Sequence, residues 1–182
     1  MKLLTVLDAV KIDLKGFSEE FYKQVCSASL KPVLESLQTV RSANVWLEIV
    51  NLMIPTLNDD PKMIDEMCRW IKENLGVNIP LHFTRFHSDY KLSHPSSTPI
   101  STLESAYEIA KKNGLMYVYI GNVSGHVYNS TFCPNCDRKV IHRTHMEVLE
   151  MNLIDGKCSI VVRSYREDGV NLGKRPAGKS RS

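Results

Sequence analysis

The stretch that decides the fold covers residues 45–76 and reads VWLEIVNLMIPTLNDDPKMIDEMCRWIKENLG. Its first ten residues are largely apolar and partly β-branched, and Pro55 follows them, which is typical of a buried strand. After Asn58, polar residues and Pro61 open a segment whose apolar side chains recur at helical spacing as far as Gly76. The stretch therefore predicts a buried strand followed directly by a helix.

The same order of strand and helix repeats on both sides of this stretch. We expect strands over residues 9–14, 79–86 and 116–121, and the predicted helices between them cover residues 18–26, 31–43 and 98–113. Strands that alternate with helices pair in parallel, because each helix carries the chain back across the sheet. Four strands are too few to close a barrel, so the expected fold is α/β, a partial, TIM-like (β/α) barrel.

Composition limits the class of protein. The chain has 182 residues, of which 43% are hydrophobic, and a net charge of +3. No apolar run approaches the roughly 18 residues of a membrane span, so we expect a cytoplasmic protein without a membrane partner. The basic residues gather in the segment 163–182, which we expect to be a disordered tail rather than a nucleic-acid-binding domain.

Asp13 and Lys15 stand at the end of the first predicted strand. Side chains two residues apart on a strand project to the same face, so a carboxylate and an ammonium meet here. Together they could hold a zwitterionic ligand, or they could form an ordinary surface ion pair. Other polar residues also follow strand ends, where (β/α) barrels bind their ligands. These are Asn58, Arg85, His87 and Asn122.

Several segments together resemble a known family. In order they read VKIDLKGF, IPTLNDD, PLHFTRFHSDYKL, TLESAYEIAKKNGLMYVYIGNV and TFCPNC. They are similar to the C-terminal half of radical SAM enzymes related to pyruvate formate-lyase activating enzyme, in particular the radical SAM member of the AmmeMemoRadiSam system. The similarity covers residues 8–158. It implies that Asp13 and Lys15 bind S-adenosylmethionine, and that His87 lies near its adenosyl or methionine portion.

The sequence departs from this family in one decisive respect. Radical SAM enzymes hold a 4Fe-4S cluster through three cysteines spaced C-x-x-x-C-x-x-C, and this sequence has no such spacing. Cys26 and Cys68 fall on predicted helices, where we expect buried thiols rather than ligands. We therefore expect a chain that lacks the N-terminal half and is catalytically impaired alone. Alternatively, it is a half-barrel subunit that needs a complementary, cluster-bearing chain. The physiological substrate is unknown.

The remaining cysteines suggest a metal site. Cys133 and Cys136 form a C-x-x-C turn, which can place two thiolates on one metal ion. The resemblance implies a second pair some twenty residues later, where Cys158 stands but Val161 replaces its partner. His142 or His145 could complete a zinc site with the three cysteines. We expect residues 1–125 to form the half-barrel and residues 126–162 a degenerate, zinc-ribbon-like knuckle. A small zinc-binding adaptor is the alternative function.

Two further histidines lie outside these proposed sites. His82 alternates with Phe83 in a predicted strand, and we expect it to be structural. His126 follows a turn beyond the last strand, where it could face a substrate.

Overall fold

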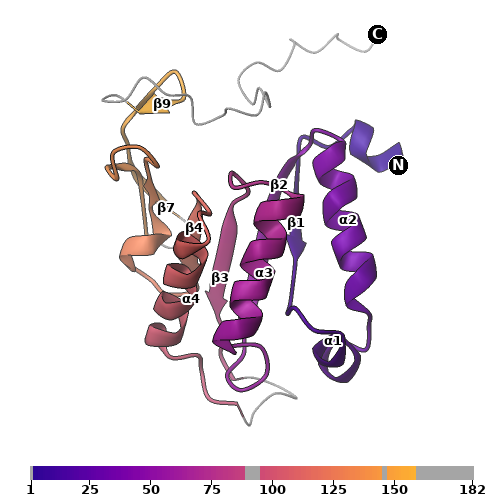
Figure 1. Ribbon diagram of the computed structural model, residues 1–182. Helices are drawn as coiled ribbons and strands as arrows, with labels where there is room; N and C mark the ends of the chain where they lie inside the picture. The colour runs from indigo at the N-terminus through magenta and orange to yellow at the C-terminus, as the bar shows by residue number, and fades with distance from the viewer. Residues whose placement is uncertain (1, 89–94, 145–146, 159–182) are drawn as a thin grey trace, which may run out of the picture.

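A parallel sheet of four strands, in the order β1-β2-β3-β4, forms the body of the protein (Figure 1). The computed structural model describes residues 2–88, 95–144 and 147–158. The four strands are β1 (Ala9–Asp13), β2 (Trp46–Met53), β3 (Leu81–Arg85) and β4 (Val118–Gly121). All three neighbouring pairs are parallel, as predicted. The predicted α/β fold class is confirmed. β2 and β3 are shorter than predicted by one or more residues at each end, and β4 begins later than predicted.

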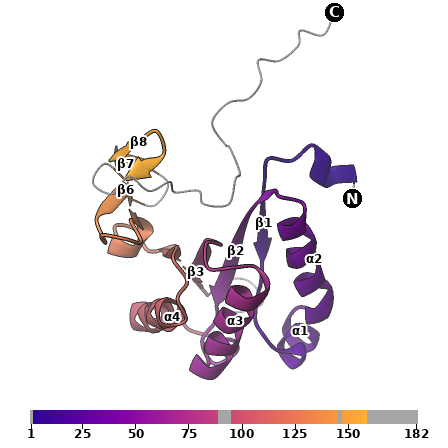
Figure 2. The same cartoon turned by 45° about the horizontal axis from the view of Figure 1, so that its top comes forward.

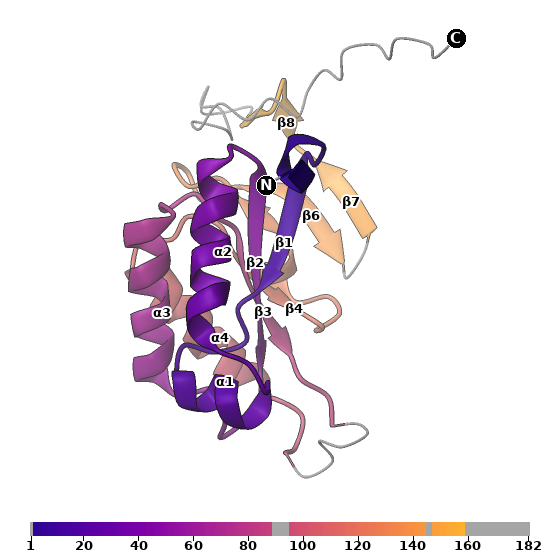
Figure 3. The ribbon, with the colours of Figure 1, turned by 90° about the vertical axis from the view of Figure 1, so that its right-hand side faces the viewer.

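Helices cover one face of this sheet (Figure 3). The four helices are α1 (Glu19–Val25), α2 (Leu30–Ser42), α3 (Pro61–Asn74) and α4 (Ile100–Lys112). Two short 3-10 helices, η1 (Lys2–Thr5) and η2 (Val127–Asn129), stand outside this layer. Within the described residues, no helix combines the length and the hydropathy needed to cross a membrane.

Side-chain caps explain where two of the helices begin. The Ser18 hydroxyl accepts a hydrogen bond of 3.1 Å from the backbone N–H of Phe21, so α1 begins after Ser18. Asp60 does the same for α3 by accepting from the N–H of Met63 at 2.9 Å. Each cap satisfies a backbone donor that would otherwise lack a partner at the first turn.

The two faces of the sheet differ in composition. Residues of the strands alternate between the helix-covered core and the opposite face, which we call the open face. Leu47, Ile49, Leu81 and Phe83 are buried against the helices. The open face contains Lys11, Asp13, Glu48, Val50, His82 and Tyr119, which the parallel register aligns across the strands. In a closed barrel this face would line the interior.

A small antiparallel unit follows β4, and we call residues 130–158 the hairpin module. It contains β5 (Thr131–Phe132), β6 (Lys139–Thr144), β7 (Glu147–Met151), β8 (Leu153–Ile154) and β9 (Lys157–Cys158). In the described residues, β5, β6 and β7 form one sheet, and β8 pairs with β9. The module lies beyond β4, on the side of the sheet away from the helices (Figures 2 and 3). The predicted tail, residues 163–182, lies outside the described residues.

Candidate functional site

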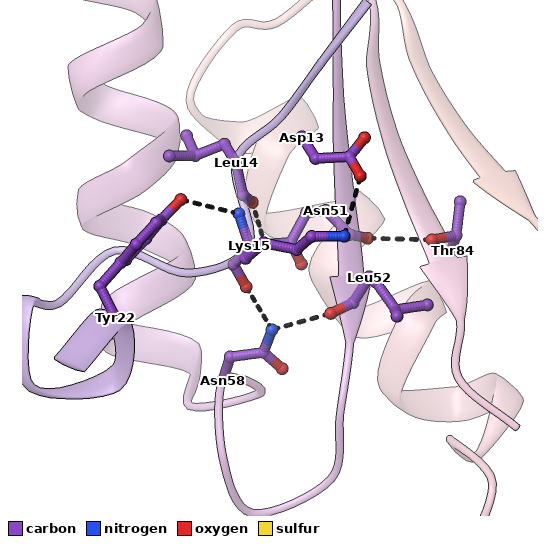
Figure 4. Close-up of polar contacts among 8 residues, drawn as sticks. All are labelled: Asp13, Leu14, Lys15, Tyr22, Asn51, Leu52, Asn58 and Thr84. Carbon is purple, nitrogen blue, oxygen red and sulfur yellow. Dashed lines mark hydrogen bonds and ion pairs between the residues drawn. The ribbon is translucent and has the colours of Figure 1, made fainter. Parts of the chain in front are cut away.

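Asp13 ends β1, and Lys15 follows it on the loop toward α1. The two side chains meet, with 2.8 Å between Lys15 Nζ and Asp13 Oδ2 (Figure 4). Their side chains are 41% and 42% exposed, so solvent or a ligand can reach both. A ligand-binding pair and a plain surface ion pair would both show this contact.

The backbone around Lys15 is held from two directions (Figure 4). Its N–H donates to the Tyr22 hydroxyl at 3.1 Å, and its carbonyl accepts from Asn58 Nδ2 at 2.5 Å. Asn58 Nδ2 also donates to the Leu52 carbonyl at 2.8 Å, and Asn58 Oδ1 accepts from the N–H of Ile54 at 2.6 Å. Asn58 thus joins the end of β2 to the end of β1, and it fixes the position of Lys15.

Tyr22 and Gly16 add to this fixed geometry. Burial raises the pKa of the Tyr22 hydroxyl, although the hydrogen bond from the Lys15 backbone opposes the shift. The hydroxyl therefore stays neutral and accepts the Lys15 N–H. A Cβ at Gly16 would lie 2.6 Å from Phe21 Cδ1, so the chain after Lys15 passes the Phe21 ring too closely for any larger residue.

His87 does not join this pair. It lies just beyond β3, its side chain is exposed, and no hydrogen bond or ion pair links it to Asp13 or Lys15 within the described part of the chain. The preceding residue is fixed, because Phe86 N–H donates to Thr98 Oγ1 at 3.0 Å. The adjoining residues 89–94, and with them His94, lie outside the described residues. The structure therefore brings two of the three predicted cofactor-binding residues together.

The other strand-end candidates have structural partners. Arg85 Nε donates to the carbonyl of Thr98 at 2.9 Å, and Asn122 Nδ2 donates to the carbonyl of Arg85 at 3.1 Å. These bonds join the end of β3 to the segments that follow β3 and β4. Arg85 therefore contacts a backbone carbonyl rather than an anionic side chain. His126 pairs with Glu104, with 3.2 Å between Nε2 and Oε1.

Cys133, Cys136 and Cys158 form one cluster. Their sulfur atoms all lie within 4.8 Å of one another, and Cys136 Sγ is 3.8 Å from Cys158 Sγ. A tetrahedral zinc ion with Zn–S bonds of about 2.3 Å would place its sulfur ligands roughly 3.8 Å apart. Cys133 and Cys158 are buried, as structural metal ligands usually are. The donor set and its spacing therefore fit zinc.

Local backbone bonds shape the cysteine turn. The N–H of Cys133 donates to the Arg138 carbonyl at 2.8 Å, and the N–H of Asp137 donates to the Cys133 carbonyl at 2.9 Å. A backbone hydrogen bond involving Arg138 lowers the pKa of the Cys136 thiol, but burial and the hydrogen bonds with the two other thiols outweigh it. The pKa of Cys136 is thus raised, because burial and the neighbouring thiols disfavour the thiolate.

The predicted fourth ligand is not part of the cluster. His142 lies in β6 opposite Glu150, and among the described residues the cluster contains only the three cysteines. His145 lies outside the described residues. Cys68 is fully buried in α3, and burial raises its pKa to about 12, while Cys26 is the C-cap of α1. Cys68 belongs to the large hydrophobic core, which confirms the expected buried thiol, whereas Cys26 packs against that core and is only partly buried.

The residues that hold the site together are only partly predictable, because the sequence places Asn58 at a strand end but does not single out Tyr22. Tyr22 and Asn58 carry no motif that announces their roles, although a polar residue shortly before Asp60 and Pro61 is a signal for a turn. Sequence reasoning missed Glu48, which contacts His82 on the open face with 3.0 Å between Oε2 and Nε2. No pattern within one strand reveals such a pair, because it depends on the register between β2 and β3.

Comparisons with known proteins show the fold. A domain of pyruvate-formate lyase-activating enzyme from Bacteroides vulgatus superposes with a TM-score of 0.59 at 17% sequence identity, over 66% of this chain and 71% of that one. An uncharacterized protein of Methanocaldococcus jannaschii is 42% identical over 162 residues, or 88% of this chain. This chain spans 48% of that relative's length. No family model matches the sequence.

Proposed function

We propose that this chain forms the S-adenosylmethionine-binding half of a radical SAM enzyme. The observation that carries the proposal is the Asp13–Lys15 pair, which Asn58 and Tyr22 hold at the C-terminal end of β1. Ligands of parallel α/β sheets bind at this end of the strands. The fold shared with the activating-enzyme domain, together with the sequence motifs that resemble the family, supports the same assignment.

The chemistry of the pair suits the cofactor. S-adenosylmethionine carries a carboxylate and an ammonium at its amino acid end, as well as ribose hydroxyls. Lys15 offers N–H donors to the carboxylate, and Asp13 accepts from the ammonium or the hydroxyls. An exposed ion pair contributes only about 0–1 kcal/mol, so the present contact between Asp13 and Lys15 can be exchanged for a ligand at small cost. His87 would contact the adenosyl or methionine portion.

The cluster is assigned to other residues. When bound to a 4Fe-4S cluster and reduced, S-adenosylmethionine supplies the radical that such enzymes use. The three-cysteine spacing for that cluster is not in this sequence. We assign the cluster to a further part of a longer protein, in line with the 48% of the relative that the chain spans, or to a partner chain. The residues described here bind and orient the cofactor.

Binding of S-adenosylmethionine to the isolated chain tests this proposal directly. We expect isothermal titration calorimetry to detect binding, and we expect Asp13→Asn and Lys15→Met each to weaken it by about tenfold, the effect of one charge-assisted hydrogen bond. Lys11→Met is the matched control, because it removes a lysine from the same strand and face. Equal affinity in the wild type, Asp13→Asn and Lys15→Met would refute the proposed role of the pair.

The cysteine cluster supports a second proposal, a metal-binding site. We propose that Cys133, Cys136 and Cys158 bind zinc, with the fourth position filled by water or by a ligand outside the described residues. The spacing of the three sulfur atoms supports this assignment. None of the cysteines in the described residues forms a disulfide bond, so the three sulfur atoms of the cluster are available as metal ligands. This site would stabilise the hairpin module and would take no part in binding S-adenosylmethionine.

Metal analysis of the purified chain tests the zinc site. After dialysis against a large volume of buffer without chelator, we expect one zinc ion per chain in the wild type. We expect less than half of that in Cys133→Ser and Cys158→Ser. Cys26→Ser is the matched control, because it removes a thiol outside the cluster and should retain the metal. Zinc that is absent from the wild type, or retained equally by all three variants, would contradict the assignment.

A further inference from the structure

A pocket of about 250 Å³ lies on the open face, where the sheet meets the hairpin module. Glu48, His82 and Tyr119 line it from three neighbouring strands, and Asn129 and Arg143 line it from the chain after β4. It contains neither the Asp13–Lys15 pair nor a cysteine of the cluster. The pocket is therefore distinct from both sites described above, and we call it the open-face pocket.

Glu48 provides a fixed negative charge. Its Oε1 accepts from Trp46 Nε1 at 3.0 Å, and a hydrogen bond of 3.0 Å joins its Oε2 to His82 Nε2. The hydrogen bond with His82 lowers the pKa of Glu48, with help from Trp46 and Arg143, and this outweighs the effect of burial. Each carboxylate oxygen has room for a second donor. Glu48 is thus ionised and able to bind a cation.

Arg143 provides the opposite charge from β6. Its Nη1 donates to Thr131 Oγ1 at 2.5 Å, and Thr131 in turn contacts the Tyr119 hydroxyl at 3.1 Å. A guanidinium has five N–H donors, and Arg143 directs its side chain toward Thr131 Oγ1 and the Tyr119 hydroxyl. The remaining donors suit a carboxylate, which a guanidinium can bind through two parallel hydrogen bonds.

Asn129 has a side-chain oxygen that accepts no hydrogen bond within the described residues. Its Nδ2 donates to the Ile120 carbonyl at 2.5 Å, which fixes the orientation of the amide. Its Oδ1 is buried and has no hydrogen-bond partner among the described residues. Because this oxygen is not accessible, Asn129 shapes the wall of the pocket and does not itself bind the ligand.

We propose that the open-face pocket binds a small zwitterion of the α-amino acid class. Its carboxylate would contact Arg143, and its ammonium would contact Glu48. The rings of His82 and Tyr119 stack on each other with centroids 4.8 Å apart, and together they close one side of the pocket beside the carbon skeleton. The volume is below that of pockets for drug-sized ligands, which restricts the ligand to a compact molecule.

This inference goes beyond the proposed binding of S-adenosylmethionine and does not depend on it. The two sites use different residues, so they can be tested separately. S-adenosylmethionine also carries an amino acid end, so binding at the two sites must be told apart. Asp13→Asn does this, because it should weaken binding of S-adenosylmethionine and leave the open-face pocket intact.

Amide chemical shifts of the isotopically labelled chain can test the pocket with three small probes. The probes are glycine, acetate and methylammonium, titrated at equal ionic strength. We expect glycine to shift the signals around Tyr119, Asn129 and Arg143 in a saturable manner, and to bind about tenfold more tightly than either half-probe, because it makes both charged contacts. Arg143→Met should weaken glycine binding at least about tenfold.

Two further variants serve as controls for misfolding. Arg143→Lys keeps the charge and should bind glycine with an affinity between that of the wild type and Arg143→Met. Arg69→Met removes a remote arginine from α3 and should bind as the wild type does. The proposal is overturned if glycine binds no better than acetate and methylammonium, or if a folded Arg143→Met variant binds glycine as tightly as the wild type.

Discussion

At the scale of single residues, Gly121 shows how closely the strands of the open face pack. A Cβ at this position would lie 2.8 Å from Thr84 Cγ2 on the neighbouring strand. We predict that Gly121→Ala lowers the free energy of unfolding by about 1–3 kcal/mol, the usual effect of overpacking. Urea denaturation monitored by circular dichroism measures the change.

The cause of that loss can be isolated with a second substitution. Thr84→Ser removes the methyl group that the new Cβ would meet, so the double variant should recover much of the stability lost in Gly121→Ala. Strictly additive effects of the two substitutions would show that the contact with Thr84 is not responsible.

Cys68 and Cys26 should differ in reactivity. Cys68 is fully buried, and burial raises its pKa to about 12, whereas Cys26 is partly exposed at the end of α1. Because the thiolate is the reactive form, we predict that iodoacetamide at mildly alkaline pH labels Cys26 in the folded protein and Cys68 only after unfolding. Mass spectrometry of peptides resolves the two sites. Equal labelling rates without denaturant would contradict the buried position of Cys68.

Glu48 links stability to pH. The hydrogen bond with His82 is the main cause of its lowered pKa in the folded state. A lowered pKa stabilises the fold above the ordinary value of 4.5, and this contribution is lost as the pH falls through the folded-state pKa. We predict that Glu48→Gln has a lower free energy of unfolding than the wild type, and that this difference is larger at pH 6 than at pH 3. An equal difference at both pH values would contradict this linkage.

At the scale of elements, the loop between β2 and α3 depends on Asn58. Its buried amide makes three hydrogen bonds to backbone atoms of Lys15, Leu52 and Ile54. Asn58→Ala leaves these groups unpaired, and we predict a loss of about 2–4 kcal/mol in the free energy of unfolding. It should also weaken binding of S-adenosylmethionine, because Lys15 loses its support.

A control within the same loop separates these effects. Asp60→Ala removes the N-cap of α3, which costs about 1 kcal/mol, but leaves the link to Lys15 intact. It should therefore reduce stability without affecting ligand binding. If Asp60→Ala impairs binding as strongly as Asn58→Ala, the loop as a whole, rather than the Asn58 link, positions Lys15.

The elements also show what the sequence can predict. Residues 45–54 are largely apolar and end before Pro55, and the caps Ser18 and Asp60 stand directly before their helices, so local patterns suffice to predict the strands and helices of the parallel sheet. Asp13 and Lys15 could be paired for the same reason, since they stand two residues apart at the end of one strand. Contacts such as Glu48 with His82 depend on the register between strands, which no local pattern specifies. The place of His87 depends on a loop, and loops follow tertiary packing.

At the scale of the whole molecule, the described residues contain two separate hydrophobic clusters. The large one lies between the parallel sheet and its helices, and the small one surrounds Cys133, Val140 and Cys158 in the hairpin module. A core of this small size rarely stabilises a fold without a metal or a disulfide. The hairpin module should therefore depend on zinc, whereas the parallel sheet should not.

Hydrogen exchange can resolve this difference within one protein. We predict that a chelator accelerates exchange at the amides of Cys133 and Asn152, which bond within the hairpin module, and leaves those of Ile49 and Leu81 unchanged. The reason is that metal binding contributes folding free energy only to the unit that holds the metal. Cys26→Ser should behave as the wild type does, and Cys158→Ser should exchange fast even with zinc. Uniform acceleration in both clusters would mean that the hairpin module and the parallel sheet unfold as one cooperative unit.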